Sequence, residues 1–352
     1  MGRKTNCKKK MKNITLFKQF NCNTPGYATC VVQNGKIIFE QCIGLSNVER
    51  STSITPTTSF RLASLTKPFT AMAIMILKEK GELNFNNNIT KFIDLPKWNE
   101  NITVRQLLTH TSGIPDHEKP LYKVIKNNEE PTMHDALNIL KNQTKTLFKP
   151  GTQFLYSDSG YVILALIIEK VSGMKYSSFL TTNIFLPLKL NNTIVMDETK
   201  SFIKNRALGY KIINKYFKLF DYDPLNYIIG DEGIYSSIRD LSIWQNVWNK
   251  ELLVSRNTLR EALSNQELSN GNVGECGFSW FIRNYKGKKI IFQDGCWVGF
   301  NNIMLTEQNS NRTVILLSNT TCFPTEKQRI KTAIMILNKS NSCSKRKKND
   351  II

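Results

Sequence analysis

FRLASLTKPFTAMAIMILKEKG, residues 60–81, joins a serine and a lysine to the start of an apolar helix. Apolar residues recur at helical spacing up to the glycine at the end of the segment, which predicts a helix over about 64–80 ended by Gly81. Ser64 and Lys67 are three residues apart, so both side chains share one face near the helix N-terminus. This arrangement predicts either a nucleophile with its base or simply a polar helix start.

The residues around the pair favour the first interpretation. Spacing alone does not decide, because Ser172 and Lys175 have the same separation. Ser64 differs in following the apolar FRLA segment and in preceding a long apolar helix, with Pro68 still in the first turn. Backbone N–H groups at a helix N-terminus can stabilise an oxyanion. Desolvation and the helix dipole predict a neutral Lys67 amine that can act as a base.

Strand-like segments lie at both ends of the chain, with helical segments between them. Residues 27–48 form two β-rich runs around Asn34-Gly35, a dipeptide typical of tight hairpins, and residues 276–319 contain further short β-rich runs. The patterns predict an α+β fold in which one antiparallel sheet, built from the N- and C-terminal segments, is flanked by helices and carries an inserted, mainly helical region. Beyond the first helix, helical patterns cover much of 84–225, about 237–249 and about 325–338. The predicted parts are a basic N-terminal tail (1–24), a sheet portion (25–83 and 226–340), a mainly helical portion (84–225) and a basic C-terminal tail (341–352).

The chain has 352 residues and a formal net charge of +20, which raises nucleic-acid or anionic-membrane binding as a possibility. Apolar residues make up 41% of the chain and charged residues 22%, which is ordinary globular composition and excludes general disorder. Basic residues are dispersed, and the dense runs are Lys8–Lys12 and Lys345–Lys348 at the two ends. These runs fit solvated tails or docking patches. No nucleic-acid-binding module accompanies the charge, so the sequence does not predict a nucleic-acid partner.

The eight cysteines contain no Cys-x-x-Cys pair and no Cys/His cluster at metal-ligand spacing. The sequence therefore predicts reduced thiols, no metal and no cofactor. The first residues lack a continuous apolar stretch and a small-residue cleavage site, and the longest apolar runs are too short to cross a bilayer. These features predict a cytoplasmic protein without a membrane span. The sequence does not indicate an oligomeric state.

A second polar cluster, Tyr156-Ser157-Asp158, lies between a Pro-Gly turn and the apolar helical pattern that ends at Gly173. Tyr156 is therefore expected on a loop. In one interpretation the ring fills that loop and Asp158 is the N-cap of the helix. In the other, Tyr156 transfers protons for the serine and Asp158 directs hydrogen bonds into the site.

Four motifs in order resemble those of the serine β-lactamase-like hydrolases, the group of class C β-lactamases, D-alanyl-D-alanine carboxypeptidases, D-aminopeptidases and esterases. They are FRLASLTK (60–67), LLTHTSGIP (107–115), PGTQFLYSDSGY (150–161) and GDEGIYSSIRDL (230–241), and the resemblance spans about residues 25–335. It implies a β-lactamase/transpeptidase-like fold. It also implies Ser64 as the acylated nucleophile, Lys67 as its base and Tyr156 as the second proton-transfer group. Asp158 stands where the β-lactamases more often have Asn, and a carboxylate cannot donate to a substrate carbonyl unless it is protonated.

The third family element, Lys-Thr-Gly or His-x-Gly, is replaced by Gln293-Asp294-Gly295. Gln can donate a hydrogen bond but carries no charge to attract a substrate carboxylate. Gly295 is expected where a strand approaches substrate closely, and the resemblance implies that the Cys296 and Ser64 amides form the oxyanion hole. The alternative is an ordinary turn between edge strands.

The residues therefore predict a serine hydrolase that acts through an acyl-enzyme on a small amide, peptide or ester. The alternative is a family member with weakened catalysis that acts as a binding or assembly scaffold, which the change at Gln293 would explain. His110 is expected to brace its loop by hydrogen bonds, and His117 and His134 lack any partner pattern. We therefore expect no catalytic histidine.

Overall fold

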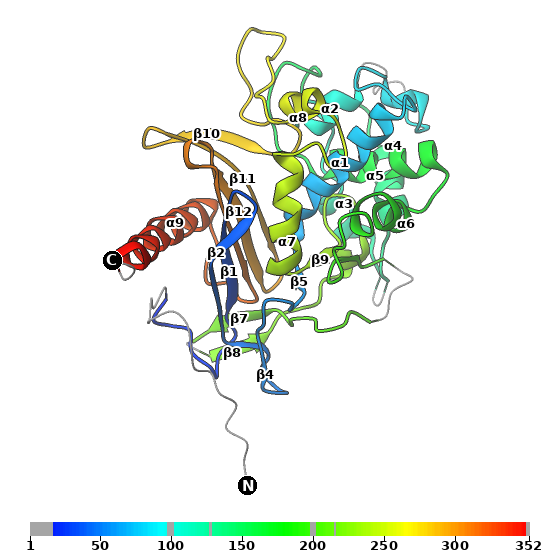
Figure 1. The fold of residues 1–352 in the computed structure, drawn as a ribbon. Coiled ribbons are helices and arrows are strands. Elements are labelled where there is room, and N and C mark those ends of the chain that lie inside the picture. The colour runs from blue at the N-terminus through cyan, green and yellow to red at the C-terminus, as the bar shows by residue number, and fades with distance from the viewer. Residues whose placement is uncertain (1–16, 97–101, 127–128, 198–201, 215, 350–352) are drawn as a thin grey trace.

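The computed structural model describes residues 17–96, 102–126, 129–197, 202–214 and 216–349, and the Lys8–Lys12 run lies outside this part of the chain. Its centre is an antiparallel six-stranded sheet in the order β10-β11-β12-β13-β1-β2 (Figure 1). The strands are β1 (Tyr27–Gln33), β2 (Lys36–Ile43), β10 (Phe281–Tyr285), β11 (Lys288–Trp297), β12 (Phe300–Glu307) and β13 (Arg312–Ser318). The two ends of the chain meet where β1 pairs with β13. The predicted α+β fold is confirmed.

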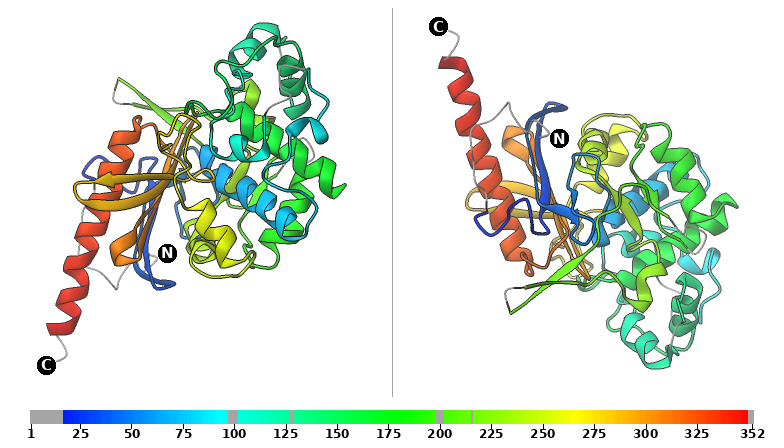
Figure 2. Two further views of the ribbon diagram at one scale, coloured as in Figure 1. Left: turned by 90° about the horizontal axis from the view of Figure 1, so that it is seen from above. Right: turned by 90° about the horizontal axis from the view of Figure 1, so that it is seen from below.

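Both faces of the sheet are buried, because apolar side chains point to each face along the strands. In β1, Tyr27 and Val31 belong to one apolar cluster, whereas Ala28, Cys30 and Val32 belong to the other. This alternation follows from the two-residue period of a strand. The sheet is therefore the middle layer of three, as the views from above and below show (Figure 2).

The first two strands form the hairpin that Asn34-Gly35 predicts. Both turn residues have positive φ, 51° for Asn34 and 77° for Gly35, as a tight hairpin turn requires. Val32 pairs with Ile37 directly after a register shift at Val31. The hairpin is thus confirmed at the predicted position.

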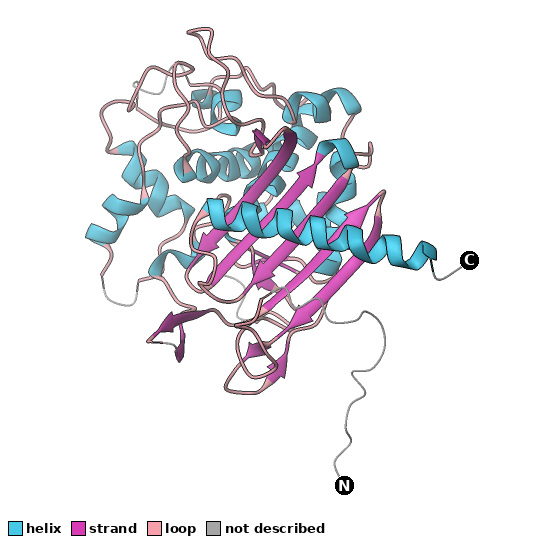
Figure 3. Cartoon of the chain, turned by 90° about the vertical axis from the view of Figure 1, so that its left-hand side faces the viewer, coloured by secondary structure: helices cyan, strands magenta, loops and turns pink. Residues whose placement is uncertain are grey.

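Helices cover the two faces of the sheet. On one face lies α9 (Glu326–Asn349), which crosses the strands (Figure 3). The other face contacts α7 (Ile238–Trp244), which continues as η6 (Gln245–Trp248), and beyond it lies the helical region. That region contains α1 (Lys67–Glu79), α2 (Val104–Leu108), α3 (Glu118–Val124), α4 (Met133–Lys141), α5 (Asp158–Ser172), α6 (Tyr176–Leu180) and α8 (Arg256–Ala262).

The predicted inserted region is mainly helical, but it also contains short strands that the sequence patterns did not indicate. β7 (Tyr210–Ile213) and β8 (Tyr216–Leu219) form a hairpin. β6 (Ile194–Val195) pairs with β9 (Ile234–Ser236), and β9 also pairs with β5 (Phe60–Arg61), just before the serine. These strands hold the start of the Ser64 segment against the helical region.

Both predicted tails are more structured than expected where the structure describes them. Phe17 and Phe20 are buried and pack against Tyr27 and Phe323, so an aromatic anchor lies inside the predicted tail 1–24. The last helix was expected to end near 338 but continues to Asn349, because no glycine or proline interrupts it. The other boundaries between the predicted parts stay predictions. No described helix has the length and apolar character needed to cross a bilayer.

Candidate active site

Ser64 lies on η1 (Ala63–Thr66), the 3-10 turn between β5 and α1. Ala63 has φ 52°, a left-handed conformation that is uncommon for a residue with a Cβ atom and that often marks functional turns. Lys67, the first residue of α1, is fully buried, and its Nζ lies 3.1 Å from Ser64 Oγ. The predicted contact between serine and lysine is therefore present.

The Lys67 amine is an ion-pair partner, which differs from the neutral base expected from the sequence. Its Nζ lies 2.5 Å from Asp158 Oδ1 and also donates to the Asp231 backbone carbonyl at 3.2 Å. Burial alone would lower the pKa of Lys67, but the charge of Asp158, with smaller effects of Tyr156 and Asp231, raises it well above its usual value. Burial likewise opposes the charge on Asp158, yet Lys67 lowers the pKa of that carboxyl. The resting site therefore contains an ammonium–carboxylate pair.

The start of α5 explains why Asp158 is available for this pair. Ser157, not Asp158, is the N-cap: its Oγ accepts the Gly160 backbone N–H at 3.1 Å. Asp158 is the first helical residue, and its carboxylate points to Lys67 instead of capping the helix. Of the two interpretations of Asp158, the structure therefore supports the one that directs it into the site.

Tyr156 is held between two rings. His110 stacks on it with ring centroids 4.4 Å apart, and Phe281 lies parallel to it at 5.9 Å. Lys67 Nζ lies 4.9 Å from the centroid of the Tyr156 ring. Burial, opposed in part by the Lys67 charge, raises the pKa of Tyr156, so the phenol is protonated at neutral pH. Tyr156 is thus fixed beside the serine and lysine as a possible proton donor.

His110 forms a bracing hydrogen bond, as predicted, and this bond joins its own loop to the Tyr156 loop. The histidine is fully buried with φ 57°, and its Nδ1 accepts the backbone N–H of Ser157 at 3.1 Å. Burial, with a smaller effect of the Lys67 charge, lowers the pKa of His110 to about 3. The ring is therefore neutral across the physiological range and orients Tyr156 and Ser157.

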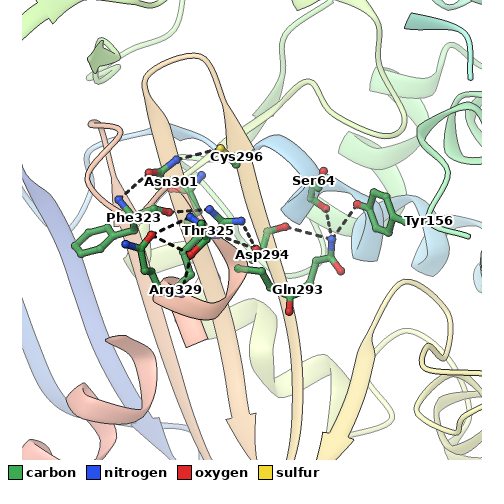
Figure 4. A network of polar contacts seen from close by, with 12 residues as sticks. Ser64, Tyr156, Gln293, Asp294, Cys296, Asn301, Phe323, Thr325 and Arg329 are labelled. Carbon is green, nitrogen blue, oxygen red and sulfur yellow. Dashed lines mark hydrogen bonds and ion pairs between the residues drawn. The ribbon is translucent and has the colours of Figure 1, made fainter. Parts of the chain in front are cut away.

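Gln293 connects the serine segment to the tyrosine (Figure 4). It is 1% exposed, and its Nε2 donates to the Ser64 carbonyl at 3.3 Å and to the Tyr156 hydroxyl at 3.2 Å. Its neighbour Asp294 turns away and forms an ion pair with Arg329 of α9, 2.6 Å between Oδ2 and Nη2. The residue that replaces the family's cation is thus part of the site, where its amide supplies hydrogen bonds without charge.

Gly295 lets β11 pass directly beside η1. β10 pairs with β11 only as far as Phe292, and the following residues of β11 contact η1 instead. A Cβ atom on Gly295 would lie 2.2 Å from the Leu62 carbonyl oxygen and 3.2 Å from the Ala63 Cβ. No side chain fits there, which explains why this position is a glycine.

Cys296 follows on the same strand, opposite Asn301 of β12. The residue as a whole is exposed, but its sulfur is partly covered and lies 3.2 Å from Asn301 Nδ2. Burial of the thiol, with a smaller opposing effect of Arg329, raises the pKa of Cys296, so the thiol is protonated at neutral pH. Cys296 lies next to the contact between β11 and η1, and the role of its backbone amide in an oxyanion hole stays a prediction.

Sequence reasoning missed two contacts of this site. The motif GDEGIYSS was recognised, but no role was given to Asp231, whose carbonyl holds Lys67. The motif was the available signal. Arg329, which fixes Asp294 and thereby β11, comes from the last helix, and no local pattern indicated it.

A match to the family model described as Beta-lactamase extends over residues 10–339, so the chain belongs to the beta-lactamase family. The chain is 32% identical over 300 residues to Penicillin-binding protein 4* of Bacillus subtilis (strain 168), covering 82% of this chain and 66% of that protein. It is 28% identical over 309 residues to Protein flp of Staphylococcus aureus (strain N315), covering 84% of this chain and 59% of that protein. The chain thus spans less than two thirds of the length of these curated relatives.

The fold agrees with this membership. Superposition on the solved structure of the octameric penicillin-binding protein homologue from Pyrococcus abyssi gives a TM-score of 0.78 at 26% identity, covering 90% of this chain and 74% of that one. The β-lactamase/transpeptidase-like fold implied by the sequence motifs is therefore confirmed.

Proposed function

We propose that this chain is a serine hydrolase that acts by acyl transfer, with Ser64 as nucleophile. The observation that carries the proposal is the 3.1 Å contact between Lys67 Nζ and Ser64 Oγ in a buried site that also holds the Tyr156 phenol. A nucleophile, a base within hydrogen-bond reach and a group that orients the base are the parts that nucleophilic catalysis needs.

Lys67 must lose a proton before it can accept one from Ser64. The carboxylate of Asp158, at 2.5 Å, can take it, and this transfer leaves the total charge of the pair unchanged. The neutral amine then removes the Ser64 proton as Oγ attacks the substrate carbonyl. The backbone N–H groups of Ser64 and Cys296 hold the resulting oxyanion.

Tyr156 completes the reaction in this proposal. Its phenol gives a proton to the leaving amine or alkoxide, and the Lys67 ammonium stabilises the phenolate that forms. A water molecule then attacks the acyl-serine and gives its proton to the phenolate, which restores the phenol. As the acid product leaves, Lys67 returns its proton to the Ser64 oxygen and Asp158 returns its proton to Lys67, so the resting site is regenerated. Gln293 orients the hydroxyl group through the 3.2 Å hydrogen bond.

The proposed substrate is a small ester, amide or peptide that carries no free carboxylate near β11. Gln293 is uncharged, Asp294 is negative and Arg329 is already paired with Asp294, so these residues supply no free cation for such a group. A classical lactam or D-alanyl-D-alanine substrate would lose this charge-assisted contact.

A substrate panel tests the proposal. We expect short-chain p-nitrophenyl esters and small amides to be hydrolysed with higher kcat/KM than nitrocefin or D-alanyl-D-alanine peptides. Turnover should vanish in Ser64→Ala and in Lys67→Ala. Ser172→Ala, from another Ser-x-x-Lys pair of the chain, is the matched control. Preference for the carboxylate substrates would contradict the substrate proposal, and a rate that survives in Ser64→Ala would contradict the hydrolase proposal.

A further inference from the structure

Next to the candidate active site, three side chains from two distant segments converge without a role in the proposed reaction. His117, Glu118 and Asp231 each offer one ligand atom, and these atoms lie within 4.8 Å of one another. Sequence spacing could not show the cluster, because Asp231 is far from the other two in the chain. The same residues, with Glu232 and Trp297, line a cavity of about 10 Å³, which matches about one water-sized sphere.

Asp231 supplies an observation independent of the clustering. Its side chain is buried, with 3% exposure of the residue, and its Oδ1 makes no hydrogen bond within the part of the chain that the structure describes. A buried carboxylate oxygen without a partner is costly and calls for a bound ion or water molecule. Its carboxylate is one of the three groups that face the same cavity.

The histidine is arranged like a metal ligand. His117 Nδ1 lies 3.0 Å from Ser159 Oγ, which also accepts the His117 backbone N–H at 3.0 Å. Either atom of this contact could be the donor. In the tautomer in which Nδ1–H donates to Ser159 Oγ, the lone pair of Nε2 is left for a cation, and such a partner on the other ring nitrogen is typical of ligating histidines.

The acidic side chains around this cavity favour a bound cation. Glu118, Asp231 and Glu232 form no ion pair with any described residue, and the charge of the nearby Lys67 is matched by Asp158. A divalent ion would offset the repulsion between these neighbouring carboxylates without moving the Lys67 pair.

We propose that His117, Glu118 and Asp231 form a binding site for one divalent transition-metal ion, with Zn²⁺ as the best-fitting ion. One imidazole and two carboxylates are a common donor set for Zn²⁺, and three protein ligands leave a fourth position for water. Ligands at about 2.1 Å in a tetrahedron lie about 3.4 Å apart, so the present spacing needs side-chain movements of about 1 Å. The strictly octahedral preference of Mg²⁺ and its reluctance to lose water make it a poorer fit.

The test is Zn²⁺ titration of the chelator-treated, dialysed full chain by calorimetry, with metal content measured after desalting. We expect one equivalent per chain and an affinity at least about 10-fold weaker in Glu118→Gln and in His117→Gln, because even outer-shell changes cost about that much. Glu82→Gln and His134→Gln change exposed residues of the same types and should bind like the unmodified chain. Any Zn²⁺ bound by cysteines elsewhere in the chain would be the same in all of these variants. It would therefore not produce a difference in affinity between the ligand variants and the controls.

Two further arms make the result decisive. Glu118 is only partly buried, so we expect the Glu118→Gln variant to fold. Its Zn²⁺ affinity can then be measured even if His117→Gln does not fold. Ser64→Ala should bind Zn²⁺ normally, which separates this site from the proposed hydrolase activity. Absence of a one-equivalent site, or equal affinity in Glu118→Gln and Glu82→Gln, would overturn the metal site.

Discussion

At the scale of single residues, the Lys67–Asp158 pair sets the chemistry of the candidate site. The contact between Ser64 and Lys67 followed from their spacing on one helix face. The charge state of Lys67 did not, because it depends on a carboxylate 91 residues further along the chain. Local sequence supplies the burial that lowers the pKa of Lys67, but only the fold supplies the anion that raises it.

Asp158→Asn should shift the pH dependence of hydrolysis. Removing the carboxylate removes the main cause of the raised Lys67 pKa and leaves burial, which lowers it. If neutral Lys67 is the base, the rise of kcat/KM with pH should move to lower pH in this variant. The measurement is kcat/KM for a p-nitrophenyl ester from pH 5 to 10. Asp94→Asn, which changes an exposed carboxylate, should leave the profile in place. An unmoved or alkaline-shifted profile in Asp158→Asn would contradict the role of the pair.

His110 predicts how stability depends on pH. Its pKa is about 3 in the folded chain against 6.5 for an ordinary histidine, so the unfolded chain binds more protons between these values. Stability should therefore rise with pH across this window and fall on acidification, with His110 contributing up to about 1.4 kcal/mol per pH unit. His110→Asn keeps a side chain that tolerates positive φ and should reduce this slope.

The measurement for His110 is the free energy of unfolding in urea at pH 7, 6 and 5. His134→Asn, at an exposed position, is the matched control and should retain the full slope. An unchanged slope in His110→Asn would show that the buried ring is not the group that titrates.

At the scale of elements, the decisive contact is that between β11 and η1. The sequence predicted a strand at β11, and this strand is present. It predicted that Gly295 lets the strand approach substrate, which stays a prediction, whereas the approach that the structure shows is to Leu62 and Ala63. The sequence could not predict that β10 ends its pairing at Phe292, which leaves the following part of β11 free to contact the serine turn. That register depends on strand lengths across the sheet, which no local pattern encodes.

Gly295→Ala should damage catalysis more than folding. The added Cβ atom would meet the Leu62 carbonyl oxygen at 2.2 Å, and backbone cannot rotate away as a side chain can. We expect β11 and η1 to separate and kcat/KM to fall by about 100-fold or more, since misplacement of about 1 Å can cost that much. Circular dichroism should show the secondary structure retained.

Gly274→Ala is the control for this experiment, because its nearest contact is 3.2 Å and its φ is not positive. It should keep the activity of the unmodified chain. Full activity in Gly295→Ala would mean that the close approach of β11 is not needed.

At the scale of the whole molecule, the motifs in order predicted most of the fold. The alternation of apolar and polar residues at both ends of the chain predicted the sheet. Helical periodicity predicted α1, α5 and α7. The hairpin of β7 and β8 and the length of α9 were missed, because short exposed strands and a helix rich in lysine have weak apolar patterns. The cluster of His117, Glu118 and Asp231 was missed for a different reason, since it exists only where distant segments meet.

The candidate site likewise assembles from segments that are far apart in the chain. Ser64 comes from η1 and Lys67 from the start of α1. Tyr156 comes from the loop before α5, Asp158 from the first turn of α5, and Gln293 from β11. The order of motifs predicted these participants. The hydrogen bond from Gln293 to Tyr156, which joins sheet and helical region across the site, was visible only in the fold.

Covalent labelling with a fluorophosphonate, followed by intact-mass and peptide mass spectrometry, tests the central proposal most directly. We predict one adduct per chain, located on Ser64, absent in Ser64→Ala and formed at least about 100-fold more slowly in Lys67→Ala, since general-base assistance is worth about that factor or more. Ser172→Ala should label like the unmodified chain. Labelling that continues undiminished in Ser64→Ala, or that maps to another residue, would contradict the assignment of the nucleophile.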